Sequence, residues 1–194
     1  MAVTQAVLCG AGADGVIGVM QPRLRIRLAT EDDAVAIGVL VRRGTRQDVL
    51  PDQTAAAAAH LMATMTARAE RESIRAGRRY HLAELGGRLV GVVATRDDKH
   101  IFRLFVSRRY QRRGIARALL RKAVADCRKR SGTRKFTLFA SACAVPAYLR
   151  LGFVASGRAL AKGAGGVVAA PMAYEPAREP AARVGKPRSR RARA

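Results

Sequence analysis

The chain has 194 residues, 49% of them hydrophobic, which predicts a single domain with a core of its own. Its three cysteines, Cys9, Cys127 and Cys143, are far apart and odd in number, which argues against a disulfide framework and a C-x-x-C metal pair. No uncharged stretch has the length and apolarity of a membrane span. We therefore expect no metal site, no membrane contact and a reducing, cytoplasmic location.

The formal net charge is +23, from 37 basic and 14 acidic residues. Such a charge attracts nucleic acids, anionic surfaces and phosphorylated cofactors. The 31 arginines against 6 lysines, in a sequence rich in alanine and glycine, are also typical of a GC-rich gene. The charge of the body of the chain by itself therefore selects no partner.

Residues 1–22 are predicted to form a flexible extension. They contain Gly10, Gly12 and Gly15 at the G-x-G-x-x-G spacing of a dinucleotide site, but Pro22 leaves no room for the helix which that site requires. The start of the chain has no basic region and contains Asp14, so it is a poor signal peptide.

The first half of the domain begins with a strand over 23–28, where apolar and basic residues alternate. Thr30 and Asp33 have capping-box spacing, which predicts a helix to about Arg43. A second helical stretch is expected over 51–76 because it is rich in alanine. Strands over 80–85 and 89–95 should form a hairpin around a Gly-Gly turn.

The second half begins with a buried strand over 101–106, followed by a helix from Gly114 to about 130. The next strand, over 135–140, should lie parallel to 101–106 because a helix connects the two. A short helix over 145–151 and a hairpin between 153 and 174 follow. The domain is thus expected over 23–175 and a disordered basic tail over 176–194. This order of elements predicts an α/β fold with a mixed sheet.

The stretch 99–121 combines a buried strand, an arginine-flanked turn and a helix start. A helix start presents unpaired N–H groups and the positive end of the helix dipole, which favours anions. Gly114 allows the backbone to approach a phosphate closely. The flanking charges come from Arg108, Arg109, Arg112 and Arg113.

Two motifs in this half of the chain resemble those of one enzyme family. Gln111 to Ala116 has the pattern Q-x-x-G-x-A, and Ala144 to Phe153 has the pattern A-x-x-x-Y-x-x-x-G-F, about 30 residues later. Together they resemble the GNAT (GCN5-related) N-acetyltransferases, and the resemblance covers roughly residues 23–174. It implies a mostly antiparallel central sheet with one splayed parallel pair, flanked by helices.

The resemblance also implies a reaction. The family transfers an acetyl group from acetyl-CoA, its co-substrate, to an amine. Tyr148, at the family's tyrosine position, is expected to protonate the leaving thiolate. The main chain of Leu104, Phe105 and Val106 would hold the pantetheine arm. The pyrophosphate would be held by Gln111, Arg112, Arg113, Gly114, Ile115 and Ala116.

The sequence departs from the family pattern at two points. Many relatives carry a carboxylate on or near the central strand, and residues 99–106 contain none. Three candidates for the general base therefore remain: His100, Glu84, or water molecules held by backbone carbonyls. Where the family often has Asn after the next strand, this chain has Ser141, which we expect to take over a hydrogen bond to the cofactor.

Two other functions remain open at this point. The basic turn and tail could contact a nucleic acid or another polyanion, although few aromatic residues are present to stack on bases. Alternatively, the fold could bind acyl-CoA without turnover, as a sensor. The chain is expected to be a monomer or a homodimer.

Overall fold

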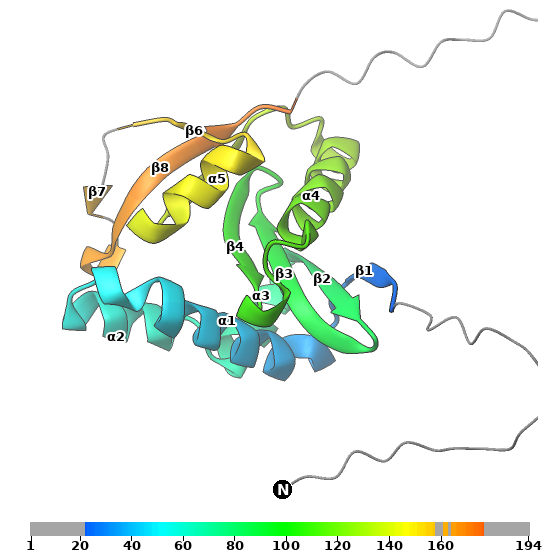
Figure 1. Cartoon of the computed structure of the whole chain (residues 1–194), viewed down its shortest axis with the longest axis horizontal. Coiled ribbons are helices and arrows are strands. Elements are labelled where there is room, and N and C mark those ends of the chain that lie inside the picture. Colours follow the sequence, from blue (N-terminus) through cyan, green and yellow to red (C-terminus); the bar gives the residue numbers. More distant parts are fainter. Residues whose placement is uncertain (1–21, 158–160, 163, 177–194) are drawn as a thin grey trace, which may run out of the picture.

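The computed structural model describes residues 22–157, 161–162 and 164–176. The glycine motif and the rest of the predicted extension before Pro22, and the basic tail after Pro176, lie outside these residues. The described chain forms a mixed sheet in the order β1-β2-β3-β4-β5-β8-β6, and β7 pairs with β8. Helices cover both faces of the sheet (Figure 1). The predicted α/β class is therefore confirmed.

The elements follow the expected order. The strands are β1 (Leu24–Leu28), β2 (Arg79–Leu85), β3 (Arg88–Arg96), β4 (His100–Val106), β5 (Phe136–Ala140), β6 (Val154–Ala155), β7 (Ala161–Lys162) and β8 (Val168–Tyr174). The helices are α1 (Ala34–Asp48), α2 (Ala55–Ala63), α3 (Ala67–Arg75), α4 (Ile115–Ser131) and α5 (Val145–Leu151), with 3₁₀ turns η1 (Glu31–Asp33), η2 (Leu50–Asp52), η3 (Arg108–Tyr110), η4 (Ala142–Ala144) and η5 (Ala164–Gly166).

The stretch expected as a single helix over 51–76 is divided into α2 and α3. Thr66 explains the break, because its extended backbone and its side chain, which accepts from the Ala69 N–H at 3.1 Å, begin a new helix. Thr54 caps α2 in the same way, through the Ala57 N–H at 3.3 Å. The alanine-rich composition predicted helix correctly but could not place the division.

Tight turns align strands β2, β3 and β4. Gly86 and Gly87 both have positive φ in the β2–β3 turn, as the hairpin prediction requires. Farther along, β3 and β4 pair through Ala94 with Arg103 and Thr95 with Ile101, so Phe102 is an extra residue in β4. This bulge places Phe102 and Arg103 on the same face of the sheet.

The parallel pair of the sheet is short. Helix α4 connects β4 to β5, and the only register pair of these strands in the described chain is His100 with Thr137. The Thr137 N–H also donates to the Lys99 carbonyl at 2.9 Å. Beyond this point the two strands diverge, and β5 continues its pairing with β8 on the other side.

The core lies on both sides of the sheet. Under α4 and α5, buried residues include Leu119, Phe136 and Phe153. Under α1 and α3, they include Ile37 and Tyr80. Burial of such side chains contributes about 1.5–3 kcal/mol each, so the two layers hold the sheet between them.

The described residues contain neither a membrane-spanning helix nor a cluster of metal ligands. No helix there has the length and apolar character required to cross a membrane. Within residues 22–157, 161–162 and 164–176, no group of three His, Cys, Asp or Glu side chains is arranged to hold a metal ion.

His81, on β2, is a buried titratable group away from the diverging strands. Its side chain is 1% exposed, and its Nδ1 atom has no hydrogen-bond partner in the described part of the chain. Its Nε2 atom lies 3.6 Å from the Asp126 carboxylate. Burial lowers the pKa of His81 despite this carboxylate, so the folded protein keeps the imidazole neutral.

This burial predicts an acid-sensitive fold. At pH values between the lowered pKa and the usual value of about 6.5, His81 is protonated in the unfolded chain but neutral in the folded protein. The free energy of unfolding therefore decreases as the pH falls through this range. The contribution is at most about 1.4 kcal/mol per pH unit. In His81→Gln, denaturant titrations from pH 7.5 to 5 should show a shallower loss of stability with acid than in the parent. His60→Gln, on the exposed face of α2, should keep the parent slope. Equal slopes in all three proteins would contradict this role.

Candidate functional site

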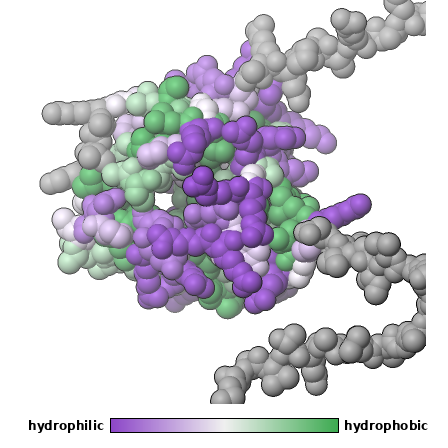
Figure 2. Space-filling view, in the orientation of Figure 1, coloured by the Kyte–Doolittle hydropathy of each residue, from purple (hydrophilic) through white to green (hydrophobic). Residues whose placement is uncertain are grey.

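A cavity of about 610 Å³ opens where β4 and β5 diverge. Its walls come from β4, from the start of α4, and from the segment between β5 and the end of α5. Leu61 and Met65 close one end together with the start of β8. A hollow is visible left of the centre of the space-filling view (Figure 2). This cavity, called the cleft below, contains most of the residues that the sequence singled out.

The β4 wall of the cleft contains Leu104, Phe105 and Val106. Leu104 and Val106 pack toward the core under α4, whereas Phe105 packs toward the core under α1. One edge of this strand pairs with β3. The other edge has no strand partner beyond His100 among the described residues. The N–H and C=O groups on this edge therefore have no partner strand and can bond a ligand, and the Val106 carbonyl also accepts one hydrogen bond from the Gln111 side chain.

The turn after η3 leads directly into α4. Arg112 and Gly114 have φ of +61° and +76°, and apart from the chain neighbours no atom of the described residues lies within 4 Å of a Cβ placed on Gly114. The Gln111 side chain donates to the Val106 carbonyl at 3.1 Å, which joins the turn to the end of β4. Gln111, Ile115 and Ala116 line the cleft. Arg112 and Arg113 are exposed, and the Arg113 guanidinium lies 5.5 Å from the Tyr110 ring centre.

The start of α4 has the electrostatics expected of an anion site. The first helical hydrogen bond runs from the Ala118 N–H to the Gly114 carbonyl at 3.0 Å. The N–H groups that precede it, from Arg112 to Ala116, have no acceptor in the described chain. The dipole of the 17-residue helix adds to the positive potential at this end.

Tyr148, on α5, lines the opposite wall of the cleft. Its ring packs edge-on against Phe153, with 5.4 Å between the ring centres. Burial raises the pKa of Tyr148 to about 12, so the phenol keeps its proton at neutral pH. Among the described residues the hydroxyl has no hydrogen-bond partner, so it remains free to donate to a ligand.

The two base candidates lie in different places. His100 lines the cleft, and its Nδ1 atom lies 2.9 Å from the Thr137 hydroxyl. Burial lowers the pKa of His100, which favours the neutral imidazole. Glu84, on β2, does not line the cleft and binds Arg27 at 2.7 Å. Only His100 therefore shares the cleft with Tyr148.

The segment after β5 contributes small polar groups. Ser141 is 8% exposed and lines the cleft, with its hydroxyl 3.4 Å from the Cys143 sulfur. The Cys143 thiol donates to the backbone carbonyl of Asp48, at the end of α1. Asp48 is the only carboxylate among the described residues that line the cleft.

A buried charged group behind the cleft was missed by sequence reasoning. Glu70, on α3, is 1% exposed, and it accepts from the Tyr80 hydroxyl at 2.6 Å and from Arg103 at 3.3 Å. Arg103 lines the cleft and also donates to the Thr64 carbonyl at 3.0 Å. The signal was present, because Arg103 interrupts an otherwise apolar strand and an arginine buried there requires a carboxylate.

A family model described as an acetyltransferase (GNAT) domain matches residues 49–176. The chain belongs to the GNAT acetyltransferase family. The match spans both the turn at Gly114 and the helix that contains Tyr148, so the resemblance noted in the sequence is confirmed. A search of curated proteins finds no match.

Solved structures share the GNAT fold. A GCN5-related N-acetyltransferase from Rhodopseudomonas palustris is 22% identical, with a TM-score of 0.64 over 83% of this chain and 99% of that one. PaiA N-acetyltransferase from Thermoplasma acidophilum, solved with coenzyme A, is 14% identical, with a TM-score of 0.63 over 79% and 99%. A GNAT acetyltransferase from Streptococcus pneumoniae is 20% identical, with a TM-score of 0.57 over 79% and 99%. The three solved structures therefore share the overall fold of this chain.

Proposed function

We propose that this GNAT protein transfers an acetyl group from acetyl-CoA to an amine by direct attack. The observation that carries the proposal is that the free edge of β4 and the open N-terminus of α4 border one cleft, with Tyr148 on its far wall. Each feature matches one part of acetyl-CoA. The free backbone groups of β4 can bond the amides of the pantetheine arm, and the start of α4 can bind the pyrophosphate. The phenol of Tyr148 can donate to the sulfur of the thioester as it leaves.

The pyrophosphate binds at the start of α4 in this proposal. The N–H groups of Arg112 to Ala116 donate to its oxygens, and Arg112 and Arg113 add charge from the solvent side. One helix-end contact contributes about 0.3–1 kcal/mol, so several must act together. The Gln111 side chain fixes the turn through its bond to Val106.

The pantetheine arm lies along the free edge of β4. Its amides bond the main chain of the 104–106 segment from the side that β5 ceases to pair, chiefly the groups of Leu104 and Val106, because the register directs those of Phe105 toward β3. Ser141, at the end of β5, offers a further hydroxyl from the opposite wall. The thioester then reaches the part of the cleft between His100 and Tyr148.

The acceptor must attack as a free amine. A lysine-like amine has a pKa of about 10.4, so releasing its proton at neutral pH costs roughly 4–5 kcal/mol. His100, kept neutral by burial, accepts this proton directly or through water. The nitrogen forms a bond to the thioester carbonyl carbon, the carbon–sulfur bond breaks, and the nitrogen loses its second proton to water, so that a neutral amide forms. The acetylated amine and the coenzyme A thiolate are the products of this step.

Tyr148 assists the departure of sulfur. Its phenol donates a hydrogen bond as negative charge develops on the thiolate, and then supplies the proton. Because a pKa of about 12 exceeds the usual thiol pKa of about 8.5, transfer of the proton costs about 5 kcal/mol, so the hydrogen bond is the larger contribution and reprotonation of Tyr148 from the solvent completes the transfer. Tyr148 then regains its proton from the solvent, so the enzyme returns to its starting state.

Gly114→Ala tests the pyrophosphate site, with Gly132→Ala as the matched control. Both glycines flank α4, have φ near +70°, and have open space around a Cβ. Each substitution should cost about 1–2 kcal/mol of stability through backbone strain. Only Gly114→Ala should weaken acetyl-CoA binding, by roughly tenfold or more. Calorimetric titration at high salt checks this, and equal affinities in the two variants would exclude the assigned phosphate site.

Tyr148→Phe tests the acid, with Tyr174→Phe as the control. Both rings pack on Phe153, but Tyr174 does not line the cleft. With an acceptor found by screening primary amines for release of the coenzyme A thiol, Tyr148→Phe should lower kcat by roughly 10²-fold with little change in KM. Tyr174→Phe should keep the parent kcat. Tight acetyl-CoA binding without release for any amine would favour the non-catalytic sensor.

His100→Gln tests the base. The parent's kcat/KM should fall with acid below a pH under 6.5, because His100 must be neutral and burial lowers its pKa. His100→Gln should lose this limb and fall by roughly 10²-fold. His81→Gln, outside the cleft, should retain it. An unchanged acid limb in His100→Gln would assign proton removal to water and backbone carbonyls instead.

A further inference from the structure

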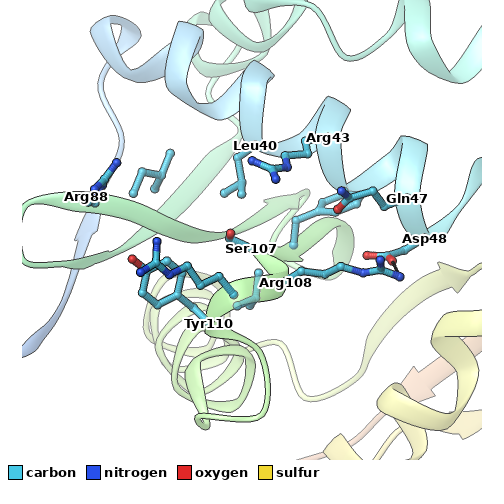
Figure 3. Close-up of a pocket in the computed structure, with 13 residues that line it drawn as sticks. Leu40, Arg43, Gln47, Asp48, Arg88, Ser107, Arg108 and Tyr110 are labelled. Carbon is cyan, nitrogen blue, oxygen red and sulfur yellow. Dashed lines mark ion pairs between the residues drawn. The ribbon is translucent and has the colours of Figure 1, made fainter. Parts of the chain in front are cut away.

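A second cavity, of about 320 Å³, lies on the other side of the end of β4. It is bordered by the C-terminal half of α1, the start of β3 and the turn η3 (Figure 3). This volume is at the lower end of the range typical of small-molecule sites. A ligand of the size of a single nucleotide or sugar phosphate would fit, whereas an extended polymer would contact only its rim.

Four arginines from three parts of the chain line this cavity. Arg43 comes from α1, Arg88 from β3, and Arg108 and Arg109 from η3. Asp48 is the single carboxylate among the lining residues, and it lies 3.4 Å from Arg108. Arg43, Arg88 and Arg109 have no carboxylate partner in the part of the chain that the structure describes. Like charges gathered around a hollow produce a strong positive potential inside it.

The rest of the lining is suited to an organic anion. In Figure 3 the Arg43 guanidinium extends from α1 above Ser107, and Arg108 extends toward Asp48. Leu40 and Leu89 provide apolar walls between these charges. Arginine guanidinium groups bind phosphate through paired hydrogen bonds, and the Ser107 hydroxyl can donate a further hydrogen bond to the same phosphate. The apolar walls would contact the body to which the phosphate is attached.

This cavity is separated from the cleft by a close helix–strand contact. Gly44 of α1 packs so closely on β4 that a Cβ there would lie 2.6 Å from the Phe105 ring. Asp48 lines both cavities, with its carboxylate toward Arg108 and its carbonyl accepting from Cys143. The two cavities are therefore neighbours with a shared wall.

We propose that the second cavity binds a phosphorylated small molecule, at a site separate from the proposed acetyl-CoA cleft. The lining of one hollow by Arg43, Arg88, Arg108 and Arg109, of which only Arg108 has a carboxylate partner in the described chain, carries this inference. It does not depend on the acetyl transfer reaction. A bound phosphate would compete with the Asp48 carboxylate for Arg108.

The test is a calorimetric titration of the full chain at 0.15 M NaCl, with inorganic phosphate, ribose 5-phosphate and AMP as probes. Acetyl-CoA is present at about 100 times its Kd, as measured beforehand on the same protein, so that the start of α4 is occupied. Ribose and adenosine serve as uncharged controls. We expect saturable one-to-one binding of at least one phosphate, weakened roughly tenfold or more in Arg43→Gln/Arg88→Gln. Arg121→Gln/Lys122→Gln removes the same charge from the exposed side of α4 and should bind like the parent.

Three results would overturn the proposal. Equal weakening by the two double variants would attribute binding to overall charge. Loss of binding in Gly114→Ala, with Arg43→Gln/Arg88→Gln unaffected, would place the phosphate at the start of α4. Absence of saturable binding for all three probes would reject the site outright. Acetyl-CoA affinity measured on the same proteins is a separate readout, so failure of this proposal and failure of the cleft assignment remain distinguishable.

Discussion

The divergence of β4 from β5 is the constraint on which the rest of the structure depends. Parallel strands that stayed paired would satisfy each other's backbone groups and leave no opening. Here the pairing is confined to His100 and Thr137 in the described chain, and β5 instead satisfies its other edge through β8. Leaving a strand edge unpaired costs backbone hydrogen bonds, and a ligand with amides along its length can restore them.

The two layers of helices hold the strands apart. Leu119 and Phe153 are buried on one face of the sheet, and Ile37 and Tyr80 on the other. The bulge in β4 places Arg103 beside Glu70, so a buried ion pair fixes the strand where its edge is free. Removal of either partner would leave a charge without compensation, which is why such a pair imposes a definite geometry.

The arginines of this chain act in different ways according to position. Arg27 and Arg79 are bound to carboxylates and support the fold. Arg112 and Arg113 flank a helix start, whereas Arg43 and Arg88 border a hollow. The composition gives only their sum with the other charged residues, a net charge of +23. Only the arrangement separates charges that are neutralised within the protein from those available to an anion.

The sequence by itself determined the local features. Alternation predicted β1, the Gly-Gly pair predicted the β2–β3 turn, and Gln111 to Ala116 with Tyr148 indicated the family, because each is a short-range pattern. The partner of Arg103, the different surroundings of His100 and Glu84, and the hollow beneath Arg43 were decided only by the tertiary structure. Each of these depends on contacts between residues far apart in the chain, and no local pattern encodes such contacts.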